Sequence, residues 1–127
     1  MITNFFVDQV KSFPNGLMFL ACEPKADRAT GEQARTKDGH FKWEVHVMTG
    51  QRNQFGQLNF DPIKIGITSE TSTINPCDDV PPMSPVELVN FELGVMERTK
   101  NGEIVGVQVW YRCSQVRSTA ATGAKAA

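Results

Sequence analysis

The sequence predicts a single domain built mainly of β-strands. The chain has 127 residues, which is the usual size of one domain and is enough to bury one hydrophobic core. Seven prolines and ten glycines divide it into short segments, a composition that favours turns over long helices. Between these breaks, several runs alternate apolar and polar residues, which is the period of a half-buried strand.

The first elements are expected in the N-terminal third. Residues 5–10 form a short apolar-rich start that is compatible with a strand. Residues 13–16, Phe-Pro-Asn-Gly, have a turn signature because proline presets φ and glycine accepts a positive φ. The apolar run at residues 17–22 then predicts a buried strand. Residues 24–40 are polar and contain Thr-Gly and Asp-Gly turn signals, so they predict a long mobile hairpin connection.

The clearest strand covers residues 41–48. Its apolar and polar residues alternate, so one face is expected to lie in the core and the other in solvent. The core face comprises Phe41, Trp43, Val45 and Val47, and the outer face comprises Lys42, Glu44 and His46. Residues 49–60 are rich in Gln and Asn and predict a loop. Residues 63–68, with isoleucine at alternate positions, predict a second half-buried strand.

The second half of the chain predicts a loop and a hairpin. Residues 70–85 are acidic and rich in proline, which is excluded from helix interiors and central strands. Residues 88–98 and 104–114 predict an antiparallel hairpin, because Asn101-Gly102 between them supplies the positive φ of a tight turn. The last residues, 118–127, lack apolar anchors and predict a disordered tail. The domain is therefore expected to span residues 1–117.

Five or six antiparallel strands in a chain this short must close on themselves to bury their apolar faces. We predict a small OB-like β-barrel, with a two-sheet β-sandwich as the alternative. OB barrels often have a helix between the third and fourth strands, but the prolines of residues 70–85 resist a helix. The barrel is therefore predicted to lack one.

Charge and cysteine content bear on the partners and the cellular compartment of the protein. The formal net charge is −1, yet residues 65–97 carry six acidic and no basic side chains, so the charge alone neither supports nor excludes a nucleic-acid partner. Three cysteines at irregular spacing argue against a disulfide framework and fit a reducing compartment. The start has no signal-peptide pattern, and the longest apolar run is far shorter than a membrane helix. We expect a cytoplasmic protein without a membrane partner.

No catalytic or metal-binding pattern is evident in the sequence. His40 and His46 would lie about 20 Å apart along a strand, too far to share a metal. There is no Gly-rich phosphate loop, and no nucleophile stands beside a base. Asp78-Asp79 lacks the further spaced oxygen ligands of a calcium loop. We therefore expect a protein that is not an enzyme and that has no metal or cofactor.

Residues 104–114 give the most informative pattern. Strand parity places Val105, Val107, Val109, Tyr111 and Cys113 on one face, predicted to be core, and Gly106, Gln108, Trp110 and Arg112 on the other. Trp110 is then exposed beside Arg112. An exposed aromatic beside cations on a sheet is how sequence-tolerant proteins stack the bases of single strands and hold their phosphates. The alternative is that neighbouring elements cover both faces and Trp110 is a packing residue.

Other aromatic and basic residues would extend this surface. Basic residues lie in the 24–40 connection, and Arg52 and Phe55 lie in the Gln/Asn-rich loop of residues 49–60. In OB barrels, these loops flank the binding face. The full set of candidate nucleic-acid-binding residues is Trp110, Arg112, Lys42, Lys64, Arg52, Phe55, Arg28, Arg35 and Lys37, and Phe60 lies in the same loop as Phe55.

Two stretches resemble proteins of mobile genetic elements. Residues 17–20 lead into Glu23-Pro24-Lys25-Ala26-Asp27-Arg28-Ala29-Thr30-Gly31-Glu32, which is similar to the opening of a family from Gram-positive conjugative elements that includes a helicase processivity factor. Asp38-Gly39 before residues 41–45, with Pro85-Val86-Glu87 downstream, resembles actinobacterial plasmid replication, integration and excision activators. Both resemblances imply an OB-like accessory protein that supports a helicase or relaxase on single-stranded DNA without chemistry of its own.

The leading hypothesis is therefore a non-enzymatic accessory protein that binds single-stranded DNA during plasmid or conjugative-element replication or transfer. The alternative is a protein-interaction module without nucleic-acid binding. Such a module could be homo-oligomeric, with exposed strand edges that pair with a partner.

Overall fold

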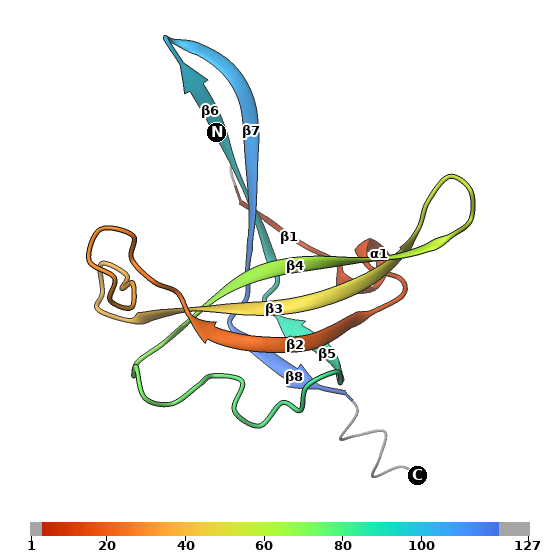
Figure 1. Ribbon diagram of the computed structural model, residues 1–127, viewed down its shortest axis with the longest axis horizontal. Helices are drawn as coiled ribbons and strands as arrows, with labels where there is room; N and C mark the ends of the chain where they lie inside the picture. The colour runs from red at the N-terminus through yellow and green to blue at the C-terminus, as the bar shows by residue number, and fades with distance from the viewer. Residues whose placement is uncertain (1–3, 120–127) are drawn as a thin grey trace.

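The computed structural model describes residues 4–119, which form one curled eight-stranded sheet and one short helix (Figure 1). The elements are β1 (Asn4–Phe6), α1 (Gln9–Ser12), β2 (Leu17–Pro24), β3 (Phe41–Arg52), β4 (Leu58–Ser69), β5 (Pro85–Val89), β6 (Glu92–Lys100), β7 (Glu103–Arg112) and β8 (Gln115–Ser118). The all-β prediction is confirmed. The expected count of five or six strands is wrong, because each strand of the last hairpin is broken into two.

An antiparallel meander of β2, β3 and β4 forms the centre of the sheet. The predicted alternation in β3 is confirmed for Trp43, Val45 and Val47, which are buried while the outer residues remain partly exposed, whereas Phe41 at the start of the strand is only half-buried. The tryptophan is 5% exposed, and its indole N–H donates a hydrogen bond to Ser69 Oγ at 2.9 Å. The inner face of the meander therefore supplies half of the buried apolar residues of the core.

The hairpin predicted around Asn101-Gly102 is confirmed, and it is longer and more bent than expected. Asn101 and Gly102 both have positive φ, and β6 pairs with β7 on either side of them. A bend at Asn90 and Phe91 separates β6 from β5, and a second bend separates β7 from β8. Asn90 takes the left-handed conformation that asparagine tolerates better than most residues.

This bent hairpin reaches both edges of the meander. Its β7 strand pairs in parallel with β4, and its β5 strand pairs with β2. The strand order is β1-β6-β7-β4-β3-β2-β5-β8. The bent hairpin thus supplies β6 and β7 on one side of the meander and β5 and β8 on the other, so the sheet curls into a half-barrel around its core.

The proline-rich segment before β5 contains no helix or strand, as predicted, but it contributes to the core. Cys77 and Val80 are buried, and Asn75 Nδ2 donates a hydrogen bond to the carbonyl of Cys22. All three cysteines are free and buried, and burial raises the pKa of the Cys113 thiol to about 12. These thiols pack as small apolar groups.

Several elements begin or end at residues other than those predicted. The loop expected at 49–60 is a turn of only five residues, 53–57, because β3 and β4 both extend into it. The start at 5–10 is divided between β1 and α1, whose N-cap is Asp8. The tail predicted from residue 118 is wrong for its first two residues, since Ser118 ends β8 and the Thr119 amide donates to the Pro85 carbonyl. The rest of that tail, residues 120–127, lies outside the described residues.

The predicted core face of residues 105–113 is only half correct. Cys113 is buried and Tyr111 packs partly against Phe13 and Phe91, whereas the three valines are exposed. The reason is that β4 pairs with β7 only beside Tyr111 and Arg112. Beyond that point β6 and β7 project from the sheet as a two-stranded arm, residues 95–109 (Figure 1). None of the described residues forms a helix that could span a membrane.

Candidate nucleic-acid interface

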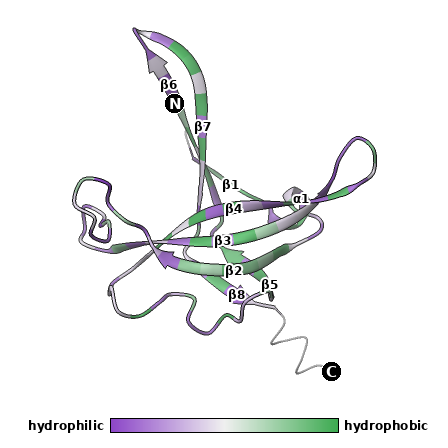
Figure 2. Ribbon diagram, viewed as in Figure 1, coloured by the Kyte–Doolittle hydropathy of each residue, from purple (hydrophilic) through white to green (hydrophobic). Residues whose placement is uncertain are grey.

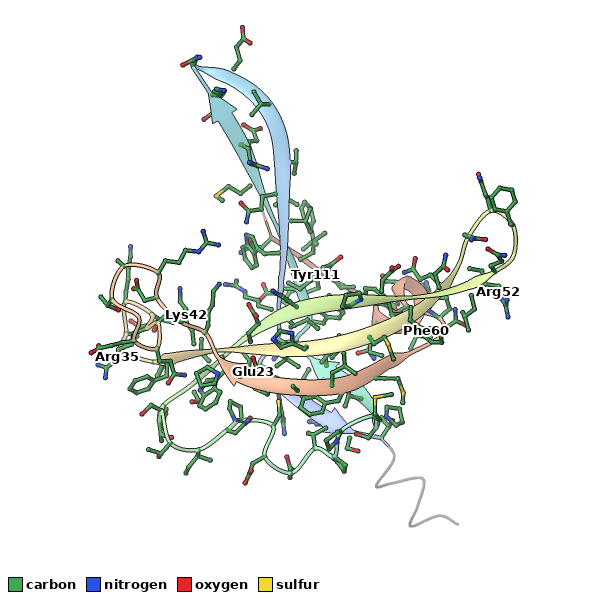
Figure 3. The ribbon with its side chains drawn as sticks, viewed as in Figure 1. Glu23, Arg35, Lys42, Arg52, Phe60 and Tyr111 are labelled. Carbon is green, nitrogen blue, oxygen red and sulfur yellow. The ribbon has the colours of Figure 1, made fainter. Side chains whose placement is uncertain are left out.

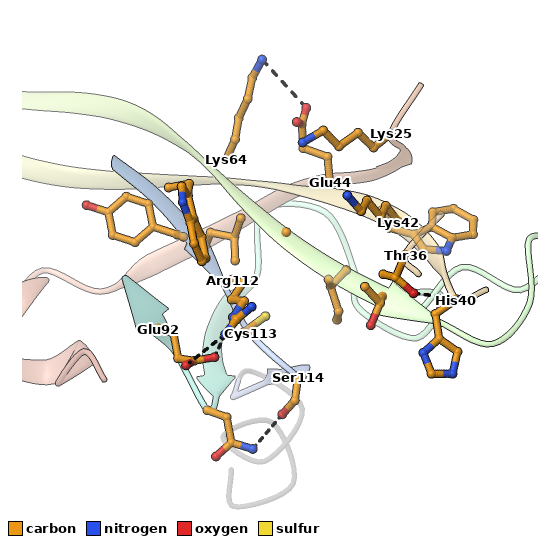
Figure 4. Close-up of a pocket in the computed structure, with 18 of the residues that line it drawn as sticks. Lys25, Thr36, His40, Lys42, Glu44, Lys64, Glu92, Arg112, Cys113 and Ser114 are labelled. Carbon is orange, nitrogen blue, oxygen red and sulfur yellow. Dashed lines mark hydrogen bonds and ion pairs between the residues drawn. The ribbon is translucent and has the colours of Figure 1, made fainter. Parts of the chain in front are cut away.

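A groove of about 1310 Å³ runs across the outer face of the curled sheet (Figure 4). Its floor is formed by outward-facing residues of β3, β4 and β7, and β1 and β6 form one flank. The loop of residues 25–40 forms the opposite flank. This is the face that the alternation in β3 predicted to be solvent-exposed.

Sheet register brings the groove residues together. In the parallel ladder, Gly66 lies beside Arg112 and Ile65 beside Tyr111. The residues that precede these pairs, Lys64 and Trp110, therefore occupy neighbouring positions on the outer face. Across β6, Arg112 is opposite Glu92.

The Trp110 indole lies directly on the backbone of Gly94. The two residues are cross-strand partners in β6 and β7, and a β-carbon at position 94 would overlap the six-membered part of the indole ring. Trp110 is half-buried, so the ring covers Gly94 and keeps part of its surface open to the groove. The guanidinium carbon of Arg112 is 5.2 Å from its ring centre, a cation–π distance.

Arg112 is held by a carboxylate on the same face. Its Nε donates to Glu92 Oε2 at 2.7 Å, and a second guanidinium nitrogen lies 3.4 Å from Glu92 Oε1. The hydrogen bond and charge of Arg112 hold the pKa of Glu92 below its ordinary value. The carboxylate therefore stays ionised at neutral pH and fixes the guanidinium beside the indole ring.

A second carboxylate lies on the β3 side of the floor. Glu44 Oε1 is 3.9 Å from Lys64 Nζ, and it is 3.2 Å from His46 Nε2 without hydrogen-bond geometry. Lys64 is largely exposed, so its ion pair with Glu44 is weak and is screened by salt. Its ammonium group is free to exchange this carboxylate for another anion.

Cations outnumber anions along the groove. Among the described residues that line it, the cations are Lys25, Lys37, Lys42, Lys64 and Arg112, and the anions are Asp38, Glu44 and Glu92. Exposed aromatic surface is present as well, since Phe6 of β1 lines the same groove and is 78% exposed. The groove therefore combines an excess of positive charge with flat apolar surfaces.

The structure gathers five of the nine candidate residues in this groove, namely Trp110, Arg112, Lys42, Lys64 and Lys37. The other four lie outside its lining. Arg35 stacks on the Phe41 ring with its guanidinium carbon 4.3 Å from the ring centre, and Arg28 is exposed in the 25–40 loop.

Arg52 and Phe55 lie at the far end of the β3–β4 hairpin (Figure 3). Figure 3 shows Arg52 at the opposite end of the sheet from Arg35. Arg52 donates a hydrogen bond to the Gly56 carbonyl, and Phe55 is 77% exposed at the tip. Sequence position grouped these residues with the groove because the two strands were expected to be shorter than they are.

Sequence reasoning missed Lys25, Phe6 and Gly94. Lys25 is part of the polar connection predicted at residues 24–40, and no pattern singles it out there, although it follows β2 directly. Phe6 reaches the groove because β1 adds to the edge of β6, where Phe6 is opposite Glu92. Long-range pairing of this kind leaves no local signal. Gly94 did carry one, since a glycine within an otherwise alternating strand often marks close approach by another group.

Replacing Gly94 with alanine should displace the Trp110 ring from its position over residue 94. The added β-carbon occupies the space of the indole ring, so the ring must rotate into solvent. We expect a red shift in tryptophan emission and loss of the contact with Arg112. Gly106→Ala is the matched control, because a β-carbon there meets no atom within 4 Å. Equal emission spectra for the two variants would contradict the position of the Trp110 ring on Gly94.

The groove lining combines cationic side chains, carboxylates and aromatic rings. No group of three or more His, Cys, Asp or Glu side chains within residues 4–119 is arranged to hold a metal ion. Among its cations, Lys25, Lys37, Lys64 and Arg112 are exposed, and Lys42 is half-buried. No family model matches this sequence, and no curated protein matches it significantly.

Proposed function

We propose that this protein is a non-enzymatic accessory protein that binds single-stranded DNA. The observation that carries the proposal is the placement of Trp110 between Lys64 and Arg112 on the floor of an open groove. An indole face can stack on any base, and the two cations can contact the phosphates on either side. Duplex DNA does not present its base faces, so this arrangement favours a single strand.

The topology of the sheet supports an OB-type barrel as the finer description of the fold. The three-stranded meander of β2, β3 and β4 is joined on one edge by β7, which runs parallel to β4, and on the other edge by β5, which is antiparallel to β2. In OB folds, oligonucleotides bind on the second and third strands, between flanking loops. Here those strands correspond to β3 and β4, which form the groove floor.

The biological setting rests on the resemblance to proteins of conjugative elements and actinobacterial plasmids. It favours a role in replication or transfer, beside a helicase or relaxase that works on the same strand. Such enzymes expose single strands as they unwind or nick DNA, and an accessory protein without chemistry of its own would hold the exposed strand. A cytoplasmic location follows from this setting.

Fluorescence anisotropy with labelled oligonucleotides tests the proposal. Binding to a single strand should weaken steeply with salt, with a slope of about −2 in log K against log salt if three groove cations contact phosphates. A duplex of the same sequence should bind more weakly. Absence of binding to single strands at low salt would overturn the proposal and would favour the protein-interaction alternative.

Lys64→Ala should reduce affinity for single strands and lower the salt slope by about 0.7, the loss of one phosphate contact. The side chain is exposed, so folding should not be affected. Arg52→Ala is the matched control, because Arg52 is equally cationic but lies at the far hairpin end. The same anisotropy titration checks both variants. An equal effect of the two would point to diffuse charge attraction rather than to this groove.

A further inference from the structure

We propose that Cys22 and Cys77 form a reversible disulfide that links the proline-rich segment, residues 70–84, covalently to the end of β2. Cys22 lies in β2, and Cys77 lies in the segment between β4 and β5. Both thiols are free and buried in this structure. Neither residue lines the groove, so the inference is independent of the proposed DNA binding.

One side chain holds the backbones of the two cysteines together. Asn75 Nδ2 donates a hydrogen bond to the Cys22 carbonyl at 2.9 Å, and Asn75 Oδ1 accepts one from the Cys77 amide at 2.8 Å. Cys22 is opposite Val45 in the antiparallel ladder of β2 and β3, and Val45 is completely buried. Opposite residues of such a ladder point to the same face, so the Cys22 side chain points into the core, where Cys77 is also buried.

The two sulfur atoms interact directly. A hydrogen bond from the Cys77 thiol to the Cys22 sulfur is the main reason why the pKa of Cys22 is lowered. The same hydrogen bond, together with burial, raises the pKa of Cys77. Cys22 therefore ionises first while Cys77 keeps its proton. The thiolate is the form of cysteine that reacts with oxidants, and a disulfide forms only between side chains that approach this closely.

Cys113 is the third cysteine of the core, and its sulfur is occupied differently. The residue lies in the bend between β7 and β8. Its sulfur accepts a hydrogen bond from the Gln115 amide, and burial raises the pKa of its thiol to about 12. Cys113 is therefore a poor nucleophile, and we do not expect it to take part in the disulfide.

The Cys22 and Cys77 pair lies at the edge of the core. Cys22 is the last apolar residue of β2, at the point where the strand becomes hydrophilic (Figure 2). Asp78 and Asp79, which directly follow Cys77, are exposed. The proline-rich segment has neither helix nor strand, and segments of this kind open locally at low cost in free energy. A small neutral oxidant can therefore reach Cys22 without unfolding of the sheet.

Hydrogen peroxide is the class of oxidant that fits this site. The Cys22 thiolate attacks one peroxide oxygen, the O–O bond breaks, and a sulfenic acid forms with release of hydroxide, which takes up the proton lost by Cys22. The Cys77 sulfur then attacks the Cys22 sulfur. The S–S bond forms, the S–O bond breaks, and the hydroxyl group leaves with the Cys77 proton as water. Peroxide accepts both electrons, and a small thiol reverses the reaction by exchange.

Peroxide treatment of the full chain in native buffer, followed by peptide mapping without reduction, tests the inference. The wild-type protein should lose two of its three free thiols and give a cross-linked peptide that joins Cys22 to Cys77. Dithiothreitol should restore both thiols. The oxidised protein should also unfold at a higher urea concentration than the reduced protein, because a link between residues far apart in the sequence restricts the unfolded chain.

Two variants identify the reacting pair. Cys77→Ala should abolish the cross-link and leave Cys22 as a sulfenic acid, which dimedone traps. Cys113→Ala is the matched control and should form the cross-link as the wild type does. Circular dichroism checks that both variants are folded, and the wild-type peptide map decides by itself if Cys77→Ala is not.

Oxidation of the protein in urea separates native geometry from random pairing. Cys77 is nearer in sequence to Cys113 than to Cys22, so loop closure in the unfolded chain favours a link between Cys77 and Cys113. A link between Cys22 and Cys77 that dominates in native buffer therefore reports the folded arrangement. Absence of this link in native buffer, or a different pairing there, would overturn the inference.

Discussion

Replacing Trp110 with alanine is expected to weaken binding of single-stranded DNA by about 1–3 kcal/mol, or about 5- to 150-fold in affinity. This is the usual contribution of one base–aromatic stack. The ring lies flat on Gly94, where it is held ready to stack without further ordering. Its removal takes away the apolar platform of the groove but leaves Lys64 and Arg112 in place.

Two controls separate stacking from indirect effects. Trp110→Phe retains a flat ring and should recover much of the lost affinity. The salt slope should be nearly unchanged in Trp110→Ala, because no phosphate contact is lost. Salt-titrated anisotropy and thermal melts on the same samples provide the measurement. A folded alanine variant with wild-type affinity would remove Trp110 from the binding site.

Replacing Trp43 with alanine should lower the free energy of unfolding by about 3–5 kcal/mol, as is usual for large buried aromatics. The residue is one of two tryptophans in the chain, and it lies in the core face of β3. Its loss leaves a cavity among Val45, Ile67 and their neighbours, and it leaves the Ser69 hydroxyl without the indole N–H. A domain of this size has only about 5–15 kcal/mol to lose.

Urea denaturation monitored by circular dichroism measures this loss. Trp43→Phe is the control, since it fills most of the cavity and removes only the hydrogen bond, which is typically worth about 1 kcal/mol. Its loss of stability should therefore be clearly smaller. An alanine variant as stable as the wild type would mean that Trp43 does not fill the core. Replacing Trp43 is thus expected to lower stability, whereas replacing Trp110 is expected to lower the affinity for single-stranded DNA.

The expectations that held are those with a local cause. Alternation in residues 41–48 fixed which face of β3 is buried, because side chains of a strand point to opposite sides in turn. Asn101-Gly102 located the tight turn, because few other residues adopt positive φ at low cost. The prolines of residues 70–85 excluded a helix for an equally local reason, the missing amide hydrogen.

The candidate site was predicted in part. Parity along β7 correctly separated Trp110 and Arg112 from Tyr111 and Cys113. It could not show which residue lies opposite Trp110. A regular hairpin around Asn101-Gly102 would pair Trp110 with Leu93, but an irregularity between Arg98 and Thr99 shifts the register by one residue and brings Gly94 there instead. Such a bulge changes which side chains meet across the ladder.

The sequence by itself determined the all-β class, the tight hairpin and the two-sided character of β3 and β7, because each depends on backbone preferences or on the two-residue period of a strand. Tertiary structure alone decided whether an apolar face is covered. Val45 and Val107 belong to the same kind of alternating pattern, yet Val45 is buried in the core and Val107 is exposed on the arm. Burial depends on which other part of the chain packs against a face. The alternation within one strand gives no information about that part.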